Sequence, residues 1–311
     1  MAEKKNQHYV PQFYLRNFSK DENSIGISFH IDTPNPGVNV EAPISRQASH
    51  DYYYTSDTSI EDDFQLIEGP ASQIISSIIS EPSIVLNEDE IYLLKHFIYI
   101  QHIRTPMHAQ MIEDIVNQMY HKLAGPDYNE IEVKVKDAPL RSLVYLLRLA
   151  FQTVDPLKLI ILDNRTQLPF ITAPDPSIYF NLYYMRRNED YGTAMPGLMF
   201  YMPISAKKAL FLYDPKVYKV KEKYMVSCDI LEVAFLNFMI YDVAIKSTKK
   251  QIFFDNRTED YYRDFELWTK CLEEATMKGV YLMFPKERGC AIWSKLISDF
   301  RMKKNTIHFI A

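Results

Sequence analysis

The sequence predicts an α+β fold, in which a mostly antiparallel sheet packs with a long kinked central helix and further helices. Helical patterns cluster between about residues 59 and 153. After residue 157, four short apolar runs bounded by Pro, Asp and Gly have the pattern of strands. Because strands and helices cluster instead of alternating strictly, this fold class is favoured over a doubly wound sheet.

The N-terminal residues 6–19 are dense in aromatic side chains, although chain termini are usually polar and poorly ordered. Pro11 suits the first turn of a short helix, because proline has no N–H to leave unpaired there. Residues 24–32 alternate apolar and polar side chains, which predicts a half-buried strand. Residues 33–46 contain three prolines and are expected to form a loop, and residues 52–55 are β-prone.

The central residues are predicted to be helical. Thr58-Ser59-Ile60-Glu61 has capping-box spacing, so a helix is expected to start near Ser59. Gly69-Pro70 is expected to break it, with a second segment reaching Ser80. Asn87 is expected to cap a long helix that Pro106 kinks or splits, since proline removes one hydrogen bond of the ladder. Residues 125–137 resemble a linker, and residues 138–153 a helix.

The second half of the chain supplies the predicted sheet. Its four strands are expected at residues 157–162, 169–172, 198–202 and 209–213. A helix follows at 230–246, a strand at 251–254 and a helix at 259–277, and the pattern of residues 280–311 is mixed.

Composition excludes several classes of protein. Among 311 residues, 47% are hydrophobic and 24% are charged, which is ordinary for a globular chain. The three cysteines, Cys228, Cys271 and Cys290, form no CxxC pair, which argues against a disulfide framework or zinc ribbon and indicates a reducing cytoplasm. No apolar segment of a signal peptide or a membrane span is evident. The net charge of −5 does not indicate a nucleic-acid binder, although local patches matter more than the sum.

Several motifs resemble one known family. Asn6-x-His8-Tyr9-Val10-Pro11, continued by Tyr14-Leu15-Arg16-x-Phe18, resembles the start of the bacterial domain of unknown function family 4238 (DUF4238). Later matches, in order, are Tyr53-Tyr54-Thr55 with Glu61 and Glu68, Gln101-x-x-Arg104-Thr105-Pro106, Phe170-Ile171-Thr172 with Asp175-Pro176, Pro203-Ile204-Ser205, and Leu236-Asn237. Ala173 and Pro174 depart from the family pattern.

The resemblance covers roughly residues 6–255. We therefore expect one α+β domain over residues 1–277, followed by a C-terminal extension over residues 278–311. Some members of the family sit in anti-phage defence loci, so the resemblance implies a defence role here. It also adds Asn237 as a candidate binding residue.

His8 and Arg104 are the leading candidates for chemistry. The unperturbed pKa of histidine lies near neutrality, so His8, with Arg16 nearby, can act as general acid or base; alternatively it tethers the N-terminus. Gln101 and Arg104 share a helical face. A buried Arg104 needs an anionic partner, which is either an internal carboxylate of Glu61, Glu68 or Asp175, or a bound phosphate.

The carboxylates allow two interpretations each. Glu61 and Glu68 are seven residues apart on one helical face, where a pair can bind Mg²⁺ or Mn²⁺ or transfer protons. Glu61 is equally explained as a capping residue. Asp175 lies between two prolines, so it either caps a turn or acts in a site.

The spacing of the histidines and lysines bears on metal and nucleic-acid binding. His96, His102 and His108 are six residues apart and point to three faces of one helix, which argues against a zinc site. Residues 207–223, beginning with Lys207 and Lys208, interleave lysines with tyrosines, which can attract phosphate and stack bases. A solvated ribbon explains the same pattern.

Two functions follow from these candidates. The first is a nuclease-like enzyme or other hydrolase acting on nucleic acid or nucleotides, with a site formed by His8, Glu61, Glu68, Arg104 and Asp175, and with Arg16, Gln101, Asn237, Lys207 and Lys208 as binding residues. The second is a non-catalytic sensor or scaffold, with a protein partner, in which the same polar residues form a structural network.

Overall fold

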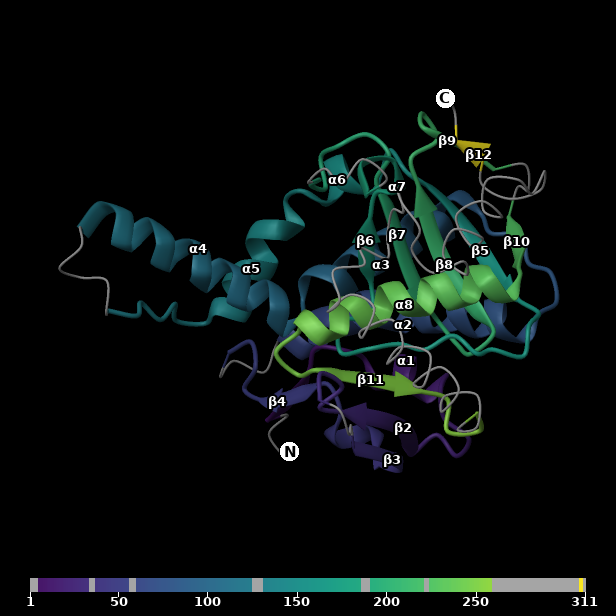
Figure 1. The fold of residues 1–311 in the computed structure, drawn as a ribbon, viewed down its shortest axis with the longest axis horizontal. Coiled ribbons are helices and arrows are strands. Elements are labelled where there is room, and N and C mark those ends of the chain that lie inside the picture. The colour runs from purple at the N-terminus through teal and green to yellow at the C-terminus, as the bar shows by residue number, and fades with distance from the viewer. Residues whose placement is uncertain are drawn as a thin grey trace, which may run out of the picture.

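A computed structural model describes residues 5–33, 37–55, 60–124, 131–185, 191–220, 224–258 and 308–309 (Figure 1). In chain order the elements are β1 (Asn6–His8), α1 (Gln12–Arg16), β2 (Ser24–Phe29), β3 (Gly37–Pro43), the 3-10 helix η1 (Ile44–Arg46), β4 (Ser49–Asp51), α2 (Ile60–Ser80), α3 (Glu88–Ile103), α4 (Pro106–Ala124), α5 (Ala138–Leu147), α6 (Ala150–Thr153), β5 (Lys158–Asn164), β6 (Ile178–Phe180), α7 (Leu182–Met185), β7 (Met199–Pro203), β8 (Lys208–Tyr213), β9 (Tyr218–Lys219), β10 (Met225–Cys228), α8 (Ile230–Lys246), β11 (Gln251–Phe254) and β12 (His308–Phe309).

The largest sheet has five strands in the order β10-β5-β8-β7-β6, and only the β10–β5 pair is parallel. Both of its faces are covered, which explains why its strands are continuous apolar runs. Leu159 and Ile161 of β5 belong to the hydrophobic core on the side of α2 and α3, whereas Ile160 and Leu162 belong to the core on the side of α8. This alternation follows the two-residue period of a strand. The α+β prediction with a mostly antiparallel sheet is confirmed.

A smaller antiparallel sheet, β11-β2-β3, lies beside the large one (Figure 1). The predicted loop over residues 33–46 is wrong in part, because residues 37–43 form β3. Among the described residues this strand pairs only with β2, so Pro43 lies on an edge strand, where proline is tolerated. The strand predicted at 169–172 is reduced to a single bridge between Thr172 and Phe253.

The long kinked central helix is divided into two helices, because α3 ends at Ile103 and α4 begins at Pro106. The predicted cap at Asn87 is confirmed: its Oδ1 accepts from the Glu90 N–H at 2.9 Å, and the Glu90 side chain accepts in return. A break at Gly69-Pro70 does not occur, since α2 continues through Pro70 to Ser80. The Ser72 hydroxyl donates to the Gly69 carbonyl at 2.8 Å and supports the helix there.

α4 projects away from the body, with α5 packed near its base (Figure 1). In the described part of the chain, no helix combines the length and apolarity needed to cross a bilayer. The predicted helix at 259–277 lies outside the described residues, as does the extension at 278–311 apart from 308–309. The proposed domain boundary therefore stays a prediction.

Candidate functional site

Arg104, at the C-terminal end of α3, is the centre of a buried polar network. Only 1% of its side chain is exposed. Its Nη1 donates to Glu68 Oε1 at 2.5 Å, its Nη2 to the His8 carbonyl at 2.5 Å, and its Nε to the Tyr54 hydroxyl at 2.9 Å. Burial opposes its charge, but Tyr54 and Glu68 outweigh burial and raise the pKa of Arg104. Among the three candidate carboxylates, Glu68 is therefore the internal partner.

The N-terminal strand is docked by a second buried residue, Gln7. The Gln7 side chain donates to the Thr55 carbonyl at 3.0 Å and accepts from the Tyr54 N–H at 2.7 Å. β1 also pairs antiparallel with β4, which brings His8 opposite Ser49. The Gln7 bonds and the strand pairing hold β1 against residues 49–55, and they thereby fix the position of His8.

An open cleft lies between α1 and α2. It has a volume of about 370 Å³, and its polar lining residues are His8, Gln12, Arg16, Gln65, Glu68 and Ser72. The cleft thus contains three of the predicted site residues, a histidine, a guanidinium and a carboxylate. Gln12 joins two of them, since its Oε1 accepts from Arg16 Nη2 at 3.2 Å and its Nε2 is 3.3 Å from His8 Nε2.

The environment of His8 favours the neutral imidazole. Burial lowers the pKa of His8, the Ser45 carbonyl partly opposes this shift, and the charges of Arg104 and Arg16 lower the pKa further. Because Gln12 already accepts through its oxygen, its amide nitrogen is the group that faces His8 Nε2. His8 Nε2 is then the acceptor, and the ring proton is on Nδ1.

Glu68 presents one carboxylate oxygen to the cleft. Its Oε1 accepts from Arg104, whereas no hydrogen bond from another described residue reaches Oε2. The side chain is 13% exposed and lines the cleft. Arg104 therefore fixes the carboxylate from behind, and Oε2 is available to a ligand.

Asp175 does not line the cleft. We group it with other buried polar residues under the name sealed polar cluster: Thr105 and Ser247, which lie beside it, and Gln101 and Ser177, whose side chains like its own are buried without hydrogen-bond partners among the described residues. Burial raises the pKa of Asp175, while the neighbouring hydroxyls of Thr105 and Ser247 oppose the shift. Those hydroxyls are close, but their geometry is too poor for hydrogen bonds, since neither carboxyl oxygen has a partner among the described residues. Both polar atoms of the Gln101 side chain and the hydroxyls of Ser177 and Ser247 also lack one.

Other predicted binding residues make contacts within the protein. Asn237 is fully buried on α8, donates to the Pro169 carbonyl at 2.8 Å and accepts from the Ile171 N–H at 3.1 Å. Lys208 pairs with Asp163 at 3.0 Å, and Lys207 donates to the Thr166 carbonyl at 2.5 Å. None of the three lines the cleft. The Glu61 side chain lies outside the described residues, as do residues 221–223.

The break between α3 and α4 brings together two histidines that were expected to point apart. The ring centroids of His102 and His108 are 4.4 Å apart. Burial lowers the pKa of His102 to about 4, although its contact with the Ser177 carbonyl opposes the shift, and burial and His102 lower the pKa of His108. Both rings are therefore neutral near pH 7. In the described part of the chain, no three His, Cys, Asp or Glu side chains gather as metal ligands do.

Sequence reasoning missed the uncharged residues of the cleft, Gln12, Gln65 and Ser72. Gln12 could have been predicted from the sequence as a neighbour of Arg16, since it lies four residues before Arg16 and the two share one face of α1. Gln65 and Ser72 flank Glu68 on α2, but nothing in their local sequence distinguishes them from ordinary surface residues.

Comparison with known proteins gives one result. The family model described as a protein of unknown function, DUF4238, matches residues 6–258. Neither the curated proteins nor the solved structures gave a match.

Proposed function

Because the chain belongs to the DUF4238 family, whose function is unknown, we propose a function from the site itself: the cleft is the active site of a hydrolase that cleaves phosphodiester or phosphoanhydride bonds in nucleic acid or nucleotides. The supporting observation is the convergence of His8, Arg16 and Glu68 on one open cleft, with Glu68 held by the buried Arg104.

Each residue has a role that fits its environment. Arg16 is exposed and binds the phosphate, since a guanidinium presents paired donors to its oxygens. His8 is neutral near pH 7 and accepts the proton of the attacking water through Nε2, once the water has displaced the Gln12 amide that faces this nitrogen. Glu68 Oε2 accepts a hydrogen bond from the same water and orients it. As the new P–O bond forms, the bond to the leaving oxygen breaks, and that oxygen takes a proton from solvent.

The test is cleavage of labelled single-stranded RNA, single-stranded DNA, duplex DNA and nucleoside triphosphates by the purified protein. Each substrate is tried with Mg²⁺, with Mn²⁺ and with a chelator. We expect His8→Ala to lower the rate by about 10²–10⁴-fold, the usual contribution of a general base, and Glu68→Gln to lower it similarly. Both variants should keep the parent's circular dichroism spectrum.

His50→Ala is the matched control, because His50 is an exposed histidine on β4 that does not line the cleft. It should retain full activity. No turnover of any substrate by the parent, or equal rates for parent and His8→Ala, would contradict the proposal.

The alternative function, a non-catalytic sensor or scaffold, is favoured by a separate observation. Arg104 is sealed and makes hydrogen bonds to His8, Tyr54 and Glu68, so the motif residues also hold three segments together. The defence role implied by the family separates the two functions. In a phage challenge of cells carrying the gene, an enzyme loses protection with His8→Ala, whereas a scaffold keeps it as long as the variant remains folded.

A further inference from the structure

The arm formed by α4 and α5 has an apolar surface that the body of the protein does not cover. Along α4, large apolar side chains recur every four residues and become more exposed towards the end of the helix: Met111 is 39%, Ile115 44%, Met119 59% and Leu123 83% exposed. The opposite side of α4 is already occupied, since Asn117 bonds the backbone of Val133 on the segment that returns along it. The exposed stripe therefore has no partner among the described residues of the arm.

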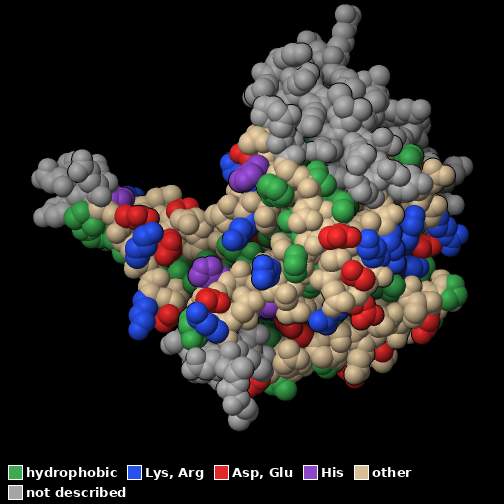
Figure 2. All heavy atoms as spheres, turned by 90° about the horizontal axis from the view of Figure 1, so that it is seen from below, with side chains coloured by type: hydrophobic (Ala, Val, Ile, Leu, Met, Phe, Trp, Pro, Cys, Tyr) green, Lys and Arg blue, Asp and Glu red, His purple; other side chains and the backbone are tan. Residues whose placement is uncertain are grey.

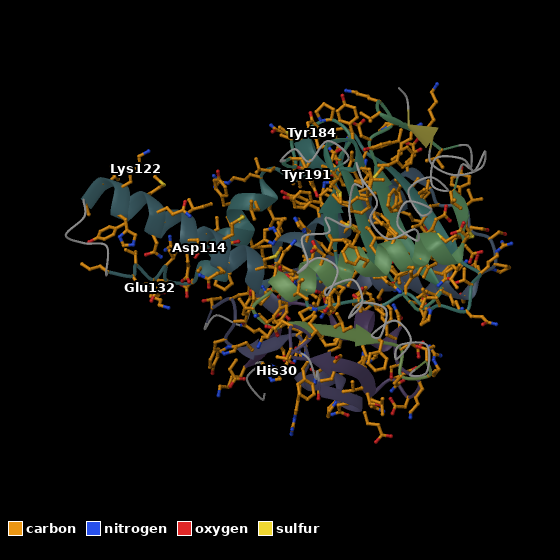
Figure 3. The ribbon with its side chains drawn as sticks, in the orientation of Figure 1. His30, Asp114, Lys122, Glu132, Tyr184 and Tyr191 are labelled. Atoms are coloured by element: carbon orange, nitrogen blue, oxygen red, sulfur yellow. The ribbon has the colours of Figure 1, made fainter. Side chains whose placement is uncertain are left out.

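Charged side chains flank the stripe with opposite signs at its two ends. Asp114 and Lys122 are both exposed on α4, and Figure 3 labels both on the projecting arm. Figure 2 shows hydrophobic, acidic and basic side chains interspersed along this arm. A membrane-binding helix usually carries an excess of basic residues on its polar face, which this arrangement lacks.

The positions are symmetric about a point in the C-terminal half of α4. Met111 and Leu123 are centred on residue 117, as are Ile115 and Met119, and Asp114 and Lys122 are centred on residue 118. Two copies of α4 that cross antiparallel near residues 117 and 118 place Met111 against Leu123 and Ile115 against Met119. They also place Asp114 of each copy near Lys122 of the other. A surface complementary to itself in this way fits an isologous two-fold interface.

α5 carries exposed apolar side chains of its own on the arm. Val144 and Tyr145 are 46% and 61% exposed, and with Leu140 they line a hollow of about 440 Å³. Specific interfaces bury at least about 1,000 Å² in total, so a contribution from α5 adds to what a single helix pair supplies.

We propose that α4 is a dimerisation helix, and that the partner of its exposed stripe is α4 of a second copy of this chain, packed antiparallel. Sedimentation equilibrium of the full-length protein should then give twice the mass of one chain. Ile115→Glu combined with Met119→Glu should give a monomer with unchanged circular dichroism. Leu66→Glu is the matched control, since Leu66 is 76% exposed on α2 of the body, and it should remain a dimer.

A charge exchange tests the orientation. Asp114→Lys alone and Lys122→Asp alone should each weaken dimerisation by about tenfold or more, because each creates two like-charge contacts. The double variant should restore the parent's affinity. A mixture of the two single variants should also form a heterodimer stronger than either homodimer.

Cross-linking tests the axis. Gln118→Cys, in a background with Cys271→Ser and Cys290→Ser, should form an intermolecular disulfide in high yield, because residue 118 lies next to its own copy only at the two-fold axis. Glu88→Cys, exposed on α3 of the body, should not. A monomeric parent would overturn the proposal, as would a dimer that survives the double glutamate substitution. So would a dimer in which Gln118→Cys does not cross-link.

Discussion

The cleft and the sealed polar cluster both start at the C-terminal end of α3, yet they differ in access and in hydrogen bonding. Arg104 belongs to the cleft side, where its donors have partners and where Glu68 and His8 reach an open volume. Gln101 and Asp175 belong to the cluster, where side chains at most 2% exposed lack hydrogen-bond partners in the part of the chain that the structure describes. The cleft can therefore receive a substrate as it stands, whereas the polar groups of the cluster are closed to solvent and to ligands.

The largest effect is expected at the boundary between the two regions. Arg104→Ala should lower the free energy of unfolding by about 3–5 kcal/mol, because it leaves Glu68 as an unpaired, largely buried carboxylate and removes the tie to His8. Arg16→Ala, at the exposed side of the cleft, should change it by less than about 0.5 kcal/mol. Urea unfolding of both variants measures the difference. Equal stabilities would show that the network does not hold the fold together.

The second effect is pH-dependent and belongs to the cluster. Because burial raises the pKa of Asp175, the folded state holds a proton that the unfolded state has released. The stability that this carboxyl contributes is therefore present below pH about 3.9 and is lost as the pH rises through the folded pKa. Asp175→Asn should remove that loss.

The stability of Asp175→Asn relative to the parent should increase by about 1.4 kcal/mol for each pH unit between the two pKa values. Urea unfolding at pH 4, 5, 6 and 7 measures this change. Asp63→Asn, exposed on α2, should run parallel to the parent. Parallel curves for Asp175→Asn as well would mean that Asp175 is ionised in the folded protein, and the cluster would then hold a compensating charge.

A smaller effect separates the glutamines of the two regions. Gln101→Met should raise the free energy of unfolding by about 1 kcal/mol, because it replaces a buried amide without partners by an apolar chain of similar length. Gln12→Met should give no such gain, since the Gln12 amide is already paired with Arg16 in the cleft. Thermal unfolding distinguishes the two. A destabilised Gln101→Met would show that ordered water completes the cluster.

The smallest effect is a shift in a pH profile. If His8 is the base, kcat/KM falls as the pH drops through its lowered pKa, since the protonated ring cannot accept a proton. Arg16→Gln removes one of the charges that lower this pKa, so the midpoint should move to higher pH by less than about one pH unit. Arg16→Lys keeps the charge and should leave the midpoint in place. A midpoint that is unchanged in Arg16→Gln would exclude His8 as the titrating group.

Local sequence patterns were sufficient to predict the elements that short-range interactions determine. The cap at Asn87, α8 at 230–246 and most strands of the large sheet follow from capping chemistry and periodicity. Only part of the cleft could be predicted from local sequence. His8 and Arg16 stand in one recognisable motif, but the choice of Glu68 as partner of Arg104 depends on two helices packing across 36 residues of sequence.

Two errors have different origins. Pro70 was expected to end a helix, yet α2 continues through it to Ser80. His102 and His108 were expected on different faces of one helix, yet the break before Pro106 turns them towards each other. The first error applied a local preference of proline to a helix that does not follow it, and the second treated α3 and α4 as one straight helix although Pro106 was itself expected to kink or split it.

The network of Arg104 also constrains when the site can form during synthesis. The guanidinium joins residues that are 96, 50 and 36 positions away along the chain. N-terminal segments leave the ribosome first, so His8 emerges early but has neither its anchor nor its neighbouring carboxylate in place until the end of α3 has followed. A nascent chain that stops before residue 104 therefore carries the histidine without the site, and the completed cleft is a property only of chains translated beyond that point.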